Sequence, residues 1–178
     1  SFGKTQTANI GRLIVDGADI QGKALRIQSD NDQIETINIG QLILKNTSEG
    51  IKVDGNGVGV NELIIGSIIL EKQSTRGIVI EANTGFVKTL IINNVIMKRI
   101  LAKPIEFVGN IDFVQLSNVM INYDPTAAST SDSIVVGSGV GKTQFSNIMA
   151  FKDYDPATSG VIVYNNFGTD NQLVNTNC

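Results

Sequence analysis

The amino-acid sequence predicts an all-β fold, a parallel β-helix (solenoid) of about six coils with three short strands per coil. Segments with an apolar-x-apolar pattern recur every 26 to 29 residues, which is the period of a repeat protein. The β-branched residues Ile and Val dominate these segments, and no stretch keeps the i, i+3, i+4, i+7 periodicity of an amphipathic helix. A β-sandwich is disfavoured, because similar segments recur at long range and do not pair across tight Asn-Gly turns.

The first strand of each coil is a short apolar-x-apolar segment that follows a sharp turn. Four of the six segments are preceded by Ala or Gly, which suits a chain that turns closely into a strand. Side chains alternate across a strand, so the two apolar residues point inward and the residue between them points outward. The six segments are 25–27, 51–53, 78–80, 105–107, 134–136 and 161–163.

The second and third strands are two apolar triplets on either side of a two-residue corner, as in residues 37–39 and 42–44 around Gly40-Gln41. Asn tolerates left-handed backbone and can hydrogen-bond within a turn. Because Asn fills most of one corner position, we expect a ladder of stacked Asn side chains. Aligned corners give the column Gly17, Gln41, Ser67, Asn94, Asn118, Asn147 and Asn175.

This combination of Gly-Ile-x-Val strand, apolar triplets and Asn corner resembles the single-stranded right-handed parallel β-helices of the pectin-lyase-like superfamily, closest in character to phage tailspikes and polysaccharide depolymerases. The resemblance covers roughly Leu13 to Asn175. It implies right-handed winding, an extracellular or virion-surface location and, for tailspikes, a homotrimer. It is weak for any one activity, because a fold does not fix a function.

Composition excludes several classes of site. The chain contains no His and a single Cys, Cys178, so a His-Cys zinc site, a catalytic triad with His and an internal disulfide are excluded. We expect neither a metal nor a cofactor. The net charge of −3 argues against nucleic acid as a partner. The longest apolar stretch, Leu63–Leu70, is too short to span a bilayer, so membrane insertion is not expected.

The length of 178 residues and the 42% hydrophobic content favour one domain over residues 1–178. The first residue is Ser1, which is consistent with a processed product or with a piece of a longer protein.

Three carboxylates on the outward face of the first strands are the candidate catalytic residues: Asp54, Glu81 and Glu106. Strand and coil spacings place the Cα atoms of Asp54 and Glu81 about 5 Å apart, and those of Glu81 and Glu106 about 8 Å apart. Such pairs suit a glycosidase. The alternative is an ordinary charged β-surface in which Lys52 pairs with Glu81 or Glu106.

Tyrosines and neighbouring aspartates of the last third of the chain are the candidate glycan-binding residues, because loops on a rigid solenoid often bind ligands. The motif Tyr-Asp-Pro occurs twice there. The alternative is that Asp-Pro only starts a turn and Tyr covers its side. The candidates are Tyr123, Asp124, Tyr154, Asp155 and Tyr164.

An outward apolar column on the strand after the Asn corner is the candidate oligomer interface, since a continuous apolar stripe is disfavoured in water. In this alignment Asp19 occupies the column in the first coil, and Ile14, Ile64 and Ile91 lie on the preceding strand. The predicted interface residues are Ile43, Ile69, Ile96, Met120 and Met149.

Together these features predict the β-helical part of a trimeric, tailspike-like surface protein that recognises a cell-surface polysaccharide. If the chain is an enzyme, the carboxylates would make it a polysaccharide-degrading glycosidase or lyase. The alternative is a purely structural shaft or adhesin segment that supplies rigidity and oligomer packing. A glycan binder should have tyrosines that line a groove, and a shaft should have an unbroken apolar face.

Overall fold

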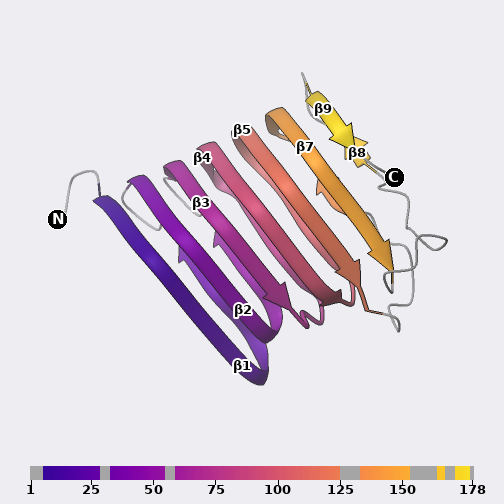
Figure 1. Ribbon diagram of the computed structural model, residues 1–178. Coiled ribbons are helices and arrows are strands. Elements are labelled where there is room, and N and C mark those ends of the chain that lie inside the picture. Colours follow the sequence, from indigo (N-terminus) through magenta and orange to yellow (C-terminus); the bar gives the residue numbers. More distant parts are fainter. Residues whose placement is uncertain are drawn as a thin grey trace.

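The chain winds into a parallel β-solenoid of about five turns, in which each turn stacks on the one before it (Figure 1). The computed structural model describes residues 6–28, 33–54, 59–124, 133–152, 164–166 and 171–176. The strands are β1 (Gln6–Gln28), β2 (Ile34–Asp54), β3 (Val60–Glu71), β4 (Arg76–Ile100), β5 (Lys103–Tyr123), β6 (Ile134–Val136), β7 (Val140–Lys152), β8 (Tyr164–Asn166) and β9 (Asn171–Thr176).

Every strand pairing is parallel and joins neighbouring coils, which confirms the predicted repeat. Leu25 pairs with Ile51, Ile51 with Ile78, and Ile78 with Ile105, as the sequence period requires. The backbone ladders continue around the corners, so β4 alone has 25 residues instead of ending at each predicted short strand. No helix of the described residues is long and apolar enough to cross a membrane.

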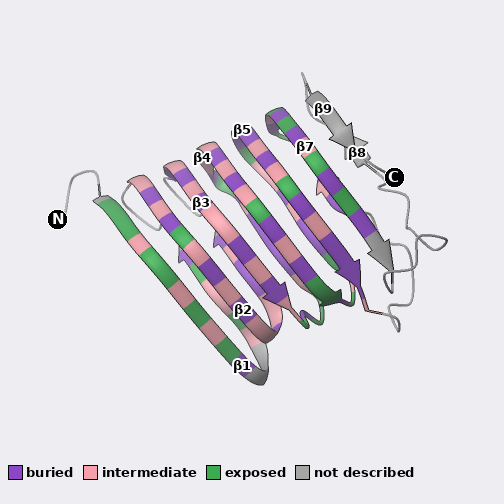
Figure 2. Cartoon of the chain, in the orientation of Figure 1, coloured by how far each residue is buried: buried purple, intermediate pink, exposed green. Residues whose placement is uncertain are grey.

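The core is a set of stacked aliphatic columns inside the coils, and buried and exposed residues alternate along the strands (Figure 2). Leu42 and Leu44 are fully buried, with Ile43 between them half-buried on the outside. This alternation confirms the predicted facing of the strand after the corner. Near the C-terminal end, the rings of Phe107 and Phe145 lie 6.2 Å apart inside the core.

The Asn corner has the predicted left-handed backbone and the predicted ladder. Asn94, Asn118 and Asn147 have φ angles of 51°, 53° and 54°. The side-chain Nδ2 of Asn118 donates to Oδ1 of Asn94 at 3.2 Å, and Nδ2 of Asn147 donates to Oδ1 of Asn118 at 2.9 Å. A second left-handed bend, at Asn46, Lys72 and Arg99, was not predicted because two of its three residues are long cations.

The predicted alignment of the first coil is wrong. The triplet Leu13-Ile14-Val15 pairs with residues 42–44, and Arg12 pairs with Gln41, so Gly11-Arg12 forms the corner and Gly17 does not. Ile14 therefore takes the column position that the sequence assigned to Asp19. Leu13 and Val15 point inward and pack against the core, and this packing sets the register of the first coil. Residues 18–20 have a similar apolar-x-apolar pattern, which is why the sequence predicts the wrong segment for this position.

The last coil also departs from the simple period. Tyr164, Asn165 and Asn166 pair with Ile134, Val135 and Val136, so β8 begins three residues later than the segment 161–163 predicted for this position. The segment 161–163 itself lies outside the described residues. The spacing from Ile134 to Tyr164 is therefore 30 residues, whereas the prediction assumed 27.

Candidate functional surfaces

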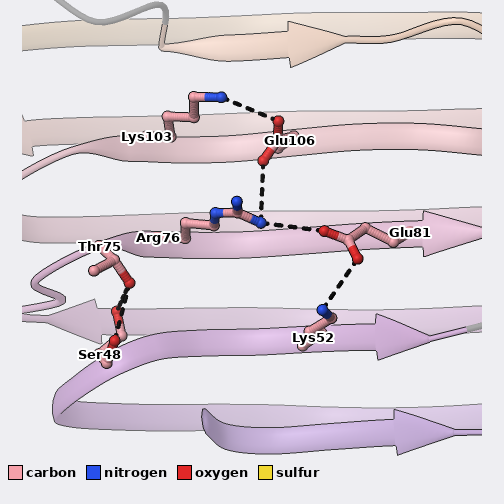
Figure 3. A network of polar contacts seen from close by, with 7 residues as sticks. All are labelled: Ser48, Lys52, Thr75, Arg76, Glu81, Lys103 and Glu106. Carbon is pink, nitrogen blue, oxygen red and sulfur yellow. Dashed lines mark hydrogen bonds and ion pairs between the residues drawn. The ribbon is translucent and has the colours of Figure 1, made fainter. Parts of the chain in front are cut away.

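The predicted carboxylate face holds a linked network of five charged side chains from three adjacent coils (Figure 3). Lys52 of β2 lies 3.0 Å from Glu81 of β4, and Arg76 of β4 lies 3.1 Å from the other oxygen of Glu81. The same Arg76 nitrogen lies 3.5 Å from Glu106 of β5, which accepts from Lys103 at 3.2 Å. Each carboxylate therefore has two cations beside it.

This network covers an apolar residue. In the backbone register Val79 lies between Lys52 and Glu106, on the outward side of its strand as predicted. Its side chain is nevertheless fully buried, although it does not belong to the core cluster inside the coil. Long charged side chains such as Lys52 and Glu106 commonly cover apolar surface with their stems, which accounts for the burial of Val79.

Two of the three predicted catalytic carboxylates, Glu81 and Glu106, are engaged by cations. Glu81 and Glu106 are brought together, but through one nitrogen of Arg76 rather than across an open gap. Asp54 pairs with Glu81 in the backbone register, and its side chain lies outside the described part of the chain. Glu106 is only 13% exposed, and its Oε2 atom is buried without a hydrogen bond, since the 3.5 Å contact with Arg76 is an ion pair only. Among the described residues no cluster of Asp, Glu or Cys could hold a metal ion.

Tyr123 does not lie where the glycan-binding prediction needs it. Its side chain is only 7% exposed and belongs to the core cluster, and its hydroxyl lies 2.9 Å from that of Ser133. Asp124 is half-buried, and its backbone N–H donates to the Ile100 carbonyl at 3.0 Å. The core accepts the Tyr123 ring because its hydroxyl has a partner there. Tyr123 is therefore a structural residue.

The other glycan-binding candidates are not placed by this structure. Tyr154 and Asp155 lie outside the described residues. Tyr164 is the first residue of β8, and only its backbone is described.

The five predicted interface residues form one continuous column with Ile14, and we call this column the aliphatic stripe. Strand register aligns its six members across six successive rungs. Its first and last residues are 56% and 44% exposed, and the others are half-buried. The aliphatic stripe consists of Ile14, Ile43, Ile69, Ile96, Met120 and Met149.

A second column, which the sequence pattern did not predict, runs beside the aliphatic stripe, two residues further along each strand. Strand register aligns Asp16, Lys45, Glu71 and Lys98, so the sign of the charge alternates from coil to coil. Lys45 and Glu71 form an ion pair of 3.2 Å. We call these four residues the charge column. In a strand, residues i and i+2 point to the same side, so the residue two positions after each stripe residue would have revealed the charge column in the sequence.

No protein-family model, no curated protein and no solved structure matches this chain.

Proposed function

We propose that this chain is a rigid structural segment, a β-solenoid shaft that packs against copies of itself through the aliphatic stripe. The observation that carries the proposal is the unbroken stripe of four Ile and two Met residues along the outside of the solenoid. A contiguous apolar surface of this kind marks an interaction site. The stripe is the unbroken apolar face that is expected of a shaft. A glycan binder should have tyrosines that line a groove, and Tyr123 is buried instead.

The ion-pair network also favours a structural role. Glu81 and Glu106 are each held by cations from the same or a neighbouring coil, and Val79 beside them is buried. A general acid or nucleophile for glycoside cleavage needs access to the sugar. Side chains that already pair with one another between coils stabilise the stacking instead.

The test is the oligomeric mass of the chain, measured by light scattering over a range of concentrations. Ile69→Lys places a charge in the centre of the aliphatic stripe, and Ile64→Lys places the same charge on the neighbouring outward column of the same coil. We expect the wild type and Ile64→Lys to self-associate and Ile69→Lys to remain monomeric. A wild type that stays monomeric at every concentration would overturn the proposal.

Recognition of a polysaccharide at the virion or cell surface is the second candidate. The observation in its favour is the network of Lys52, Arg76, Glu81, Lys103 and Glu106, which offers charged donors and acceptors over three adjacent coils (Figure 3). The Asn ladder and the coil pattern support a relationship with the pectin-lyase-like superfamily. Calorimetric titration with a panel of polysaccharides tests this candidate, and binding should weaken in Arg76→Ala. Product analysis of the same mixtures tests cleavage.

A further inference from the structure

The charge column specifies how two copies would meet on the aliphatic stripe. Read from the first coil to the fourth, its signs are minus, plus, minus, plus: Asp16, Lys45, Glu71, Lys98. Read from the fourth coil to the first, the signs are plus, minus, plus, minus, which is opposite at every position. A copy that runs in the opposite direction along the solenoid axis therefore presents an opposite charge to every member of the column.

We propose that the aliphatic stripe pairs with that of a second copy in an antiparallel dimer. Its two-fold axis runs parallel to the strands, midway between the coils of Ile43 and Ile69. Asp16 then faces Lys98 of the second copy, and Lys45 faces Glu71, with each contact made twice by symmetry. This inference rests on the proposed function and names the partner and its orientation.

The apolar residues support the same position of the two-fold axis. Within the four overlapping coils the aliphatic stripe is made only of isoleucine, so Ile14 faces Ile96 and Ile43 faces Ile69. Met120 and Met149 extend beyond the overlap. Face-to-face packing of two sheets with nearly aligned strands is a common arrangement, and β-branched side chains of similar volume fill such a layer well.

The polar flank on the other side of the stripe is compatible with this arrangement. It carries Arg12, Gln41 and Ser67 in successive coils. The two-fold axis places this flank opposite itself, so Gln41 faces Ser67 and no like charges meet. Two copies that run in the same direction would instead place each charge column against this flank, where Arg12 faces Asp16 but no carboxylate faces Lys45 or Lys98.

The overlap is small. Four coils span about 19 Å, and a four-residue strand spans about 13 Å. This footprint is well below the ~800 Å² per partner of a standard stable interface. The dimer is therefore expected to be weak and to depend on concentration, with the charge column supplying direction more than affinity.

Two complementary charge variants test the orientation. Lys98→Glu alone places two like-charge contacts in the antiparallel dimer, and so does Asp16→Lys alone. We expect each to weaken self-association by about tenfold. A one-to-one mixture of the two variants restores opposite charges at both contacts, so the mixture should associate nearly as well as the wild type. Lys142→Glu, at an exposed position on β7 outside the stripe, is the control for net charge.

Spin-label distances give an independent readout of direction in a Cys178→Ser background. Asn38→Cys lies on the second coil and Gln144→Cys on the sixth. In the antiparallel dimer the two Asn38 labels are offset by one coil spacing, about 5 Å, and the two Gln144 labels by seven, about 34 Å along the axis. Equal distances at both positions would show a parallel assembly. That result, or a mixture of charge variants that associates no better than its components, would overturn the antiparallel dimer and leave the self-associating shaft in place. A monomeric wild type would overturn both.

Discussion

Single residues at the corners set how closely the coils can stack. A Cβ atom on Gly50 would lie 2.6 Å from the carbonyl oxygen of Gly77, and one on Gly77 would meet the carbonyl oxygen of Pro104. These glycines precede the inward strand of their coils, where the repeat predicts small residues. The reason is the approach of the next coil's backbone, which leaves no room for a side chain.

We predict that Gly77→Ala lowers the free energy of unfolding by about 1–3 kcal/mol, since the obstacle is backbone that cannot move without separating two coils. Gly11→Ala is the matched control, because a Cβ atom there meets nothing within 4 Å. Urea denaturation followed by circular dichroism measures both. Equal stabilities of the two variants would contradict the close stacking at Gly77.

At the scale of the elements, the coils are tied together on the outside as well as through the core. The ladder of Asn94, Asn118 and Asn147 links one corner, and the network around Arg76 links β2, β4 and β5 on another face. Exposed ion pairs contribute little to stability. Arg76 differs because it contacts two carboxylates that are both mostly buried.

We predict that Arg76→Ala destabilises the solenoid by about 1–2 kcal/mol, because Glu81 and Glu106 lose their shared cation and Val79 loses part of its cover. Lys103→Ala should cost less than about 0.5 kcal/mol, since the Lys103 side chain is nearly half exposed and its ion pair in this network is with one carboxylate, that of Glu106. Thermal unfolding of both variants checks the difference. If Lys103→Ala cost as much as Arg76→Ala, the shared contact would not be the source of the effect.

At the scale of the whole molecule, stability is distributed along a single axis. Each coil contacts only its neighbours, so interior coils have two partners and the coil of β1 has one among the described strands. The burial follows this order. Inward residues of β4 such as Ile78 and Leu90 are fully buried, whereas Ile10, Leu13 and Val15 of β1 are only partly buried.

Among β1 to β5, we predict that amide hydrogen exchange is slowest in β4 and fastest in β1, because opening an end coil breaks one interface and opening a central coil breaks two. Exchange measured by mass spectrometry on peptides from each strand checks this gradient. Uniform protection from β1 to β5 would instead indicate that the described coils open as one cooperative unit.

The solenoid, its period, the inward and outward columns of the central coils and the Asn ladder could all be predicted from the sequence alone. These features depend on local alternation and on spacing along the chain, which repeat in every coil. Tertiary structure decided the register of the first and last coils, because strand pairing and core packing select among similar triplets. It also decided that Tyr123 and Val79 are buried and that Arg76 joins Glu81 to Glu106. Those outcomes depend on side chains from other coils, whose positions the local pattern does not contain.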